Sequence, residues 1–128
     1  MALLVLFTLP IFAKHVDVDN AKVVASTFWS QNVGKLTRAP FSDVTSQTEF
    51  TNFYIFNASD GFVIVSADDI AYPILGYSDA GNFDPQNIPV NMYEWLQGYE
   101  DEIQFGIENG ISASAEIAAD WEKLSSGQ

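Results

Sequence analysis

The sequence predicts an α+β domain in which a small antiparallel β-sheet, a hairpin plus at least one further strand, packs against about three helices. Two observations support this fold class. β-Branched and aromatic residues are concentrated in two runs, 53–58 and 61–67, that are separated by two turn residues. Apolar residues before and after these runs recur at spacings of three and four, which is the period of one helix face. Because 48% of the 128 residues are hydrophobic, we expect one buried core and a single domain over residues 14–128.

The first helix is expected to begin after Asp17 or Asp19, either of which can cap its N-terminus. It should end near Gly34. Its apolar face would consist of Ala21, Val24, Ala25 and Phe28. The segment 35–49 that follows has no sustained hydrophobic period and contains Pro40 and many hydroxyl side chains, so we interpret it as a surface connection.

The two β-rich runs should form a hairpin that turns at Ser59-Asp60, with Gly61 available for a positive φ angle. A third strand is expected over residues 73–78, because strong turn residues follow at 79–82. All three runs are apolar on both faces. The sheet should therefore be covered by helices on at least one face and contact something on the other.

The longest helix is expected to follow Pro89 and to stop at Asn109-Gly110. Its predicted apolar stripe contains Met92, Trp95, Leu96, Tyr99, Ile103 and Ile107. A shorter helix, begun by Ser112 or Ser114, should close the chain. The apolar residues of that helix are Ile117, Ala118, Trp121 and Leu124.

The N-terminus carries an apolar run over residues 2–12 that is too short to span a bilayer as a helix. Ala13 offers a small residue at a possible cleavage site before Lys14. We therefore predict a signal peptide over residues 1–13 and a secreted or periplasmic protein. The alternative interpretation of this run is a buried first strand, although Pro10 interrupts its pattern.

The charge balance is strongly acidic, with 17 acidic against 5 basic residues and a formal net charge of −12. Such a charge repels phosphate backbones and anionic lipid surfaces, so neither a nucleic acid nor, after signal cleavage, a membrane is expected as partner. A protein partner should present a neutral or basic face. Acidity also keeps a monomer soluble, and we expect a monomer.

The sequence contains no credible catalytic constellation, and we expect no enzyme. It has no cysteine, which excludes thiolate catalysis, and its single histidine, His15, lies beside the predicted cleavage site and is interpreted as a solvated terminal residue. Asp79, Asn82 and Asp84 vaguely resemble a calcium loop, but no bidentate Glu follows at the required position. These residues are better explained as turn formers, so we expect no metal and no cofactor.

Two stretches carry a family resemblance: YIFNASDGFVIVSADDIAYPILGYSDAGNFD (54–84) and NMYEWLQGYEDEI (91–103). They resemble the propeptide of streptopain-type bacterial cysteine peptidases and the separate inhibitor proteins related to that propeptide. The resemblance implies an antiparallel sheet with packed helices that occludes the active-site cleft of a streptopain-like cysteine peptidase, in cis or in trans. The alternative is a secreted carbohydrate- or surface-binding module on the same scaffold.

The resemblance also implies an inhibitory residue. In the family, an Asn near the start of the long helix enters the cleft and displaces the catalytic His, and the matching position here is Asn91, with Asn87 as the fallback. A competing interpretation is that Asn91 and Glu94 form a capping box. Candidate contact residues, where they are exposed, are Tyr72, Tyr77, Phe83 and Ile88. Aromatic residues at strand positions also often belong to the core, so both roles stay open.

Overall fold

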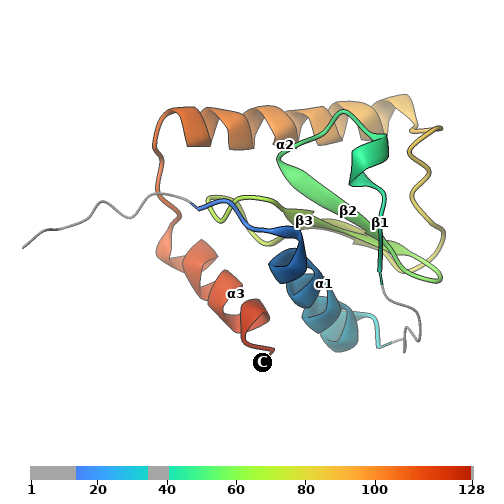
Figure 1. The fold of residues 1–128 in the computed structure, drawn as a ribbon, viewed down its shortest axis with the longest axis horizontal. Helices are drawn as coiled ribbons and strands as arrows, with labels where there is room; N and C mark the ends of the chain where they lie inside the picture. Colours follow the sequence, from blue (N-terminus) through green and yellow to red (C-terminus); the bar gives the residue numbers. More distant parts are fainter. Residues whose placement is uncertain (1–13, 35–40, 128) are drawn as a thin grey trace, which may run out of the picture.

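The computed structural model describes residues 14–34 and 41–127, and the predicted signal peptide over 1–13 lies outside these ranges. The described strands form one antiparallel sheet in the order β1–β2–β3–β4, and three α-helices accompany it (Figure 1). The strands are β1 (Ser42–Asp43), β2 (Phe53–Asn57), β3 (Phe62–Ser66) and β4 (Ile74–Ser78). The helices are α1 (Val18–Asn32), the 3₁₀ helix η1 (Thr45–Gln47), α2 (Val90–Glu108) and α3 (Ala115–Ser125). The predicted α+β class is confirmed.

Helices cover both faces of the sheet: α2 crosses one face, and α1 and α3 lie against the other (Figure 1). Side chains of β2 and β3 alternate between the two faces because the strand period is two. One core, between the sheet and α1 and α3, includes Trp29, Phe56, Val63, Val65 and Trp121. The other core, between the sheet and α2, includes Phe53, Ile55, Ile64, Phe83 and Leu96. The second face of the sheet is thus covered by the chain's own longest helix.

Both ends of α1 and the start of α3 follow the predicted capping signals. Asp17 caps α1, because its carboxylate accepts a hydrogen bond from the backbone N–H of Asn20 at 2.8 Å. Ser114 caps α3 in the same way through the N–H of Ile117 at 3.2 Å. The predicted stop of the first helix is also correct, since Gly34 follows α1 with a φ of 69°. These features depend on residues within one helical turn of each other.

The interpretation of residues 35–49 as a surface connection is wrong for its described part. Residues 41–49 contain β1 and η1, and Phe41 and Val44 are buried. The hydroxyl side chains that suggested a loop serve the sheet, because the Thr45 hydroxyl accepts a hydrogen bond from the backbone N–H of Ile55 at 2.8 Å. A strand of two residues is too short to show a period of two in the sequence.

The apolar stripe of α2 is narrower than predicted. Leu96 and Ile103 are buried, but Trp95 and Ile107 are 43% and 42% exposed. Polar contacts complete the docking of this helix: the Glu100 carboxylate accepts hydrogen bonds from the backbone N–H groups of Thr51 and Asn52, the latter at 2.9 Å. A carboxylate that accepts several backbone N–H groups is a strong anchor. It ties α2 to the residues that lead into β2.

Asp68 makes the stability of the fold depend on pH. The residue is 4% exposed, and this burial is the main cause that raises the pKa of its carboxyl. The hydrogen bond from the N–H of Ile70 and the nearby His15 lower the pKa, whereas the charge of Asp69 raises it further. The folded protein thus binds this proton more tightly than the unfolded chain does. The contribution of this carboxyl to stability therefore falls as the pH rises from about 4, the ordinary Asp value, through the raised pKa.

Replacing Asp68 by Asn should remove this dependence. We expect the free energy of unfolding of the variant, relative to the parent, to rise with pH and to level off once the parent's carboxyl is ionised. Urea unfolding at several pH values between about 4 and 7 measures it. The exposed Glu122→Gln exchange on α3 is the control. A difference between Asp68→Asn and parent that stays constant over this range would contradict the prediction.

Candidate functional site

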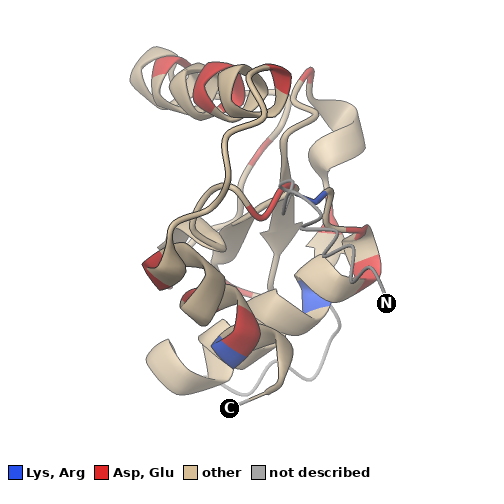
Figure 2. Ribbon diagram, turned by 90° about the vertical axis from the view of Figure 1, so that its left-hand side faces the viewer, with Lys and Arg blue, Asp and Glu red and all other residues tan. Residues whose placement is uncertain are grey.

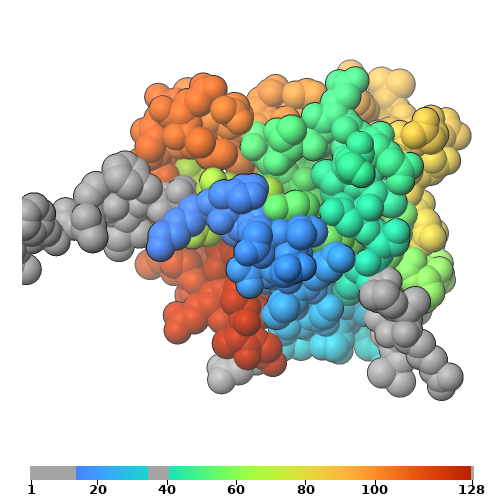
Figure 3. Space-filling model, viewed as in Figure 1, coloured from blue at the N-terminus to red at the C-terminus, as the bar shows by residue number. Residues whose placement is uncertain are grey.

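The loop that joins β4 to α2, residues 79–89, forms one end of the molecule together with the first turn of α2. We call residues 79–89 the α2 entry loop. In Figure 1 it runs along the right-hand end of the sheet, and Figure 3 shows it in yellow at the outer surface there. The first turn of α2 contains Asn91, at which the sequence predicts an inhibitory residue, and the α2 entry loop contains the fallback, Asn87. The geometry of this end therefore decides whether either side chain is accessible.

Side chains from the β2–β3 hairpin hold the α2 entry loop in place. The Asn57 amide oxygen accepts from the N–H of Phe83 at 2.8 Å, and its nitrogen donates to the Phe83 carbonyl at 2.9 Å. The Asp60 carboxylate accepts from the N–H of Gly81 at 2.7 Å. With its nitrogen turned toward the hairpin, the Asn82 amide donates to two hairpin carbonyls, those of Ala58 and Gly61, at 3.1 Å each. The loop is therefore ordered before any partner arrives.

Phe83 anchors this loop through its buried side chain and is not an exposed contact residue. Its side chain is 4% exposed and packs edge-on against Phe62, with ring centroids 5.6 Å apart. Asp84 forms a turn, since its carboxylate accepts from the N–H of Gln86 and its carbonyl from the N–H of Asn87. Across the described part of the chain, no group of three or more His, Cys, Asp or Glu side chains is placed to hold a metal ion.

The capping-box interpretation of Asn91 is wrong. The N-cap of α2 is Pro89, and no side chain caps this helix end. Asn91 is already the second helical residue, whereas a cap must sit in the extended conformation just before the helix. Its side chain is exposed, and the neighbouring Val90 is 75% exposed. The start of α2 therefore presents an asparagine side chain outward instead of using it for its own helix.

The remaining candidates are divided between two places. Asn87 is exposed and Ile88 is half-buried in the α2 entry loop, where both line a cavity of about 240 Å³. Tyr72 and Tyr77 are 45% and 51% exposed, but they belong to β4 and the residues before it. Tyr77 packs on Phe28 of α1 with ring centroids 5.0 Å apart. Asn87 and Ile88 thus line one cavity just before Asn91 in the chain, and neither Tyr72 nor Tyr77 is among the residues that line it.

Sequence reasoning missed Asn57 as a site residue. Its partner Phe83 is 26 residues away, and neither spacing nor composition reveals that pairing. The one available signal was an asparagine at the end of a strand next to a predicted hairpin turn, a position that favours local hydrogen bonds. His15, in contrast, is exposed as expected, although its backbone also pairs with Asp68.

The described chain is a sheet enclosed by helices, with a loop at one end that side chains of the β2–β3 hairpin hold in place. The chain matches the Spi protease inhibitor family over residues 13–103 and belongs to that family. It is a protease-inhibitor or propeptide type of domain and not an enzyme. The predicted relationship to streptopain-type propeptides and their separate inhibitors is confirmed.

Two relatives extend this assignment. The chain is 33% identical over 109 residues to the thiol protease/hemagglutinin PrtT of Porphyromonas gingivalis, an alignment that covers 78% of this chain and 13% of that protein. It is 42% identical over 70 residues to streptopain of Streptococcus pyogenes, with 52% of this chain and 17% of streptopain covered. The chain thus spans less than a fifth of the length of these relatives. No solved structure matches it.

Proposed function

We propose that this domain binds a streptopain-like cysteine peptidase and occludes its active-site cleft with the α2 entry loop and the first turn of α2. The family assignment supports an inhibitory, propeptide-like role. The observation that carries the finer proposal is the exposure of Asn91 at a helix start that does not use its side chain as a cap. The domain acts either within the precursor of such a peptidase or as a separate inhibitor.

The mechanism is steric and needs no cofactor. Asn91 inserts its amide, which both donates and accepts hydrogen bonds, into the cleft, and Val90 supplies exposed apolar surface beside it. Because Asn57 and Asp60 order the α2 entry loop in the free domain, little conformational entropy remains to be lost on binding. Asn87, exposed in the same loop, is the fallback for the inserted residue.

The charge of the domain favours a basic partner surface. The chain has 17 acidic against 5 basic residues, and in Figure 2 the acidic ones are spread over the molecule, including its helices. Such a surface accelerates the encounter with a basic partner more than it tightens the final complex. We propose a secreted or periplasmic monomer. No helix in the described ranges is long and apolar enough to cross a membrane.

Titration of the domain into an active streptopain-like peptidase tests the proposal. Cleavage of a peptide substrate should slow in proportion to added domain, and the domain alone should cleave nothing. A glycan array run in parallel tests the carbohydrate-binding alternative. If a cognate peptidase is unaffected while the array shows saturable binding, the inhibitory proposal fails and the alternative replaces it.

The two hydrogen bonds between Asn57 and Phe83, which we call the Asn57 clamp, should matter for inhibition. Replacing Asn57 by Ala removes both hydrogen bonds to Phe83, and we expect a loss of about 1–3 kcal/mol in stability together with weaker inhibition. Amide hydrogen exchange at Gly81, Phe83 and Asn87 should accelerate more than exchange in β3. Asn57→Asp keeps the acceptor for the Phe83 N–H and should show an intermediate effect. Unchanged exchange in the loop of Asn57→Ala would show that the clamp does not order it.

A further inference from the structure

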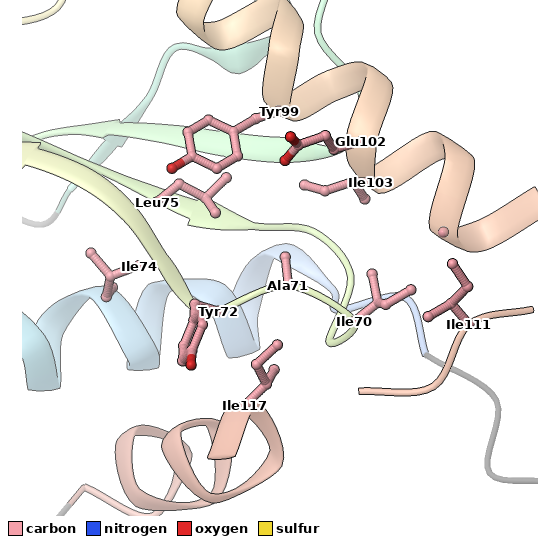
Figure 4. Close-up of a pocket in the computed structure, with 11 residues that line it drawn as sticks. Ile70, Ala71, Tyr72, Ile74, Leu75, Tyr99, Glu102, Ile103, Ile111 and Ile117 are labelled. Atoms are coloured by element: carbon pink, nitrogen blue, oxygen red, sulfur yellow. The ribbon is translucent and has the colours of Figure 1, made fainter. Parts of the chain in front are cut away.

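A groove opens along the outer edge of the sheet, between α2 and α3 and away from the α2 entry loop. Figure 4 shows its walls: Tyr99, Glu102 and Ile103 from α2, Leu75 from β4, and Ile117 from α3. The cavity measures about 430 Å³, and most of its lining side chains are apolar. We call this feature the β4 groove.

The β4 groove lies at an open strand edge. β4 is the last strand in the sheet order and pairs with β3 on one side only, within the chain that the structure describes. A strand of this kind leaves backbone N–H and C=O groups on its outer edge that a further strand can pair with. Recognition of extended peptides by strand addition uses such edges together with pockets for alternate side chains.

A second cavity lies next to the first and shares Tyr72 and Ile74 with it. It measures about 300 Å³ and also contacts Phe28 of α1 and Asp120 and Lys123 of α3. Successive side chains of a strand point to opposite faces of a sheet. A strand added to β4 would therefore direct alternate side chains toward α2 and toward α1 and α3.

The charges around these cavities are mainly negative. Glu102 lines the first cavity, Asp120 lines the second, and the Tyr72 hydroxyl between them donates to the Glu116 carboxylate at 3.3 Å. The negative charge of Glu116 also raises the pKa of the Tyr72 hydroxyl. An occupant with basic side chains fits this surface, whereas a second copy of a chain of net charge −12 would meet like charge.

We propose that the β4 groove binds an extended segment of the peptidase partner, in which apolar side chains alternate with Lys or Arg, by adding it to β4 as a further strand. The identity of the partner rests on the proposed inhibitory function. The apolar side chains enter the first cavity beside Leu75 and Ile103, and the basic ones lie near Asp120 and Glu116. The Glu102 carboxylate at the first cavity adds to the attraction for a basic segment. This second contact is separate from the cleft contact at Asn91 and lengthens the time for which the inhibitor stays bound.

A synthetic peptide tests the groove without any peptidase. The probe is fluorescein-labelled Arg-Leu-Arg-Leu-Arg-Leu-amide, and its fluorescence anisotropy is measured with the protein at about 0.15 M salt, which screens distant charges. We expect saturable binding that weakens about tenfold in the Glu102→Gln/Asp120→Asn variant. The matched control is Glu108→Gln/Glu122→Gln, which makes the same charge change on α2 and α3 at residues outside both cavities. The control should bind like the parent.

Two further measurements separate strand addition from simple charge attraction. Two peptides, each methylated at one of the two alternating sets of backbone nitrogens, keep their charge but each lose the donors of one strand edge, and at least one of them should not bind. Binding of both methylated peptides equal to that of the parent peptide, or equal weakening in the control variant, would overturn the proposal. Sedimentation of the protein alone shows whether two copies pair through the edge of β4. If the protein is a dimer and the Arg-Leu peptide dissociates it, the groove binds a second copy of the chain and the proposal is overturned.

The inhibition assay distinguishes failure of the groove from failure of the proposed function. If the parent inhibits a peptidase and the Glu102→Gln/Asp120→Asn variant inhibits less while the control does not, both proposals stand. If the parent does not inhibit, the proposed function and the assignment of the partner fail, although the peptide result still reports on the groove. If inhibition and peptide binding are both unchanged in the variant, the groove proposal alone is overturned.

Discussion

Replacing Asn91 by Asp is expected to leave the domain as stable as the parent but to weaken inhibition of a streptopain-like peptidase by roughly tenfold or more. Asn91 is the second residue of α2, where a carboxylate interacts favourably with the helix dipole, so stability should hold or rise slightly. In the complex, the same carboxylate would lie in a protein cleft without a matched partner. Burying such a charge is unfavourable.

The Ala variant sharpens this test, because the capping role is excluded by the position of Pro89. Asn91→Ala should melt like the parent, since alanine is well tolerated inside a helix, and should also inhibit less. Gln86→Glu, an exposed exchange in the neighbouring α2 entry loop, controls for an added negative charge. Inhibition should be compared across pH, because a cationic catalytic His attracts the new carboxylate. If both Asn91 variants inhibit like the parent while Asn87→Asp does not, Asn87 is the inserted residue.

Replacing Gly61 by Ala is expected to destabilise the fold by about 3–5 kcal/mol. Gly61 ends the hairpin turn with a φ of 108°, which L-residues with a side chain rarely adopt. A Cβ there would collide with the backbone carbonyl of Ser78 and lie 2.6 Å from the indole ring of Trp29. Because Trp29 is 2% exposed in the core between the sheet and helices α1 and α3, it has no room to move away.

Gly81→Ala is the matched control for this prediction. Gly81 also has a positive φ, 76°, but a Cβ there meets nothing within 4 Å. This variant should lose only the backbone term, about 1–2 kcal/mol. Urea unfolding of both variants measures the difference. Equal losses would show that the contact with Trp29 and Ser78 contributes nothing beyond backbone strain.

The features that the sequence predicted well depend on neighbours in the chain. The hairpin turn at Ser59-Asp60, the cap at Asp17 and the end of α1 near Gly34 each involve residues within a few positions of one another. Their physical causes, turn dihedrals and unsatisfied backbone groups at helix ends, act locally. The family resemblance belongs to the same level, because it rests on contiguous stretches of sequence.

Local pattern could not decide which apolar residues are accessible. The sequence offered both Phe83 and Tyr77 as candidate contact residues, yet the Phe83 side chain is 4% exposed and the Tyr77 side chain is 51% exposed. Which of them is buried depends on the tertiary packing, since Phe83 lies in the core beside α2 and Tyr77 packs on Phe28 of α1. The short strand β1 was missed for a related reason, since its pairing with β2 joins Ser42 to Asn57 across 15 positions in sequence.

By itself, the sequence determined the α+β class, the hairpin, the helices, the caps of α1 and α3 and the membership of an inhibitor family, because each is set by local chemistry or by contiguous similarity. Only the tertiary structure decided how the candidate site is presented. The Asn57 clamp on Phe83 and the docking of α2 through Glu100 join residues 26 and 48 positions apart. Such pairs form only when packing of the two cores brings distant segments together, and that packing exposes Asn91 and opens the β4 groove.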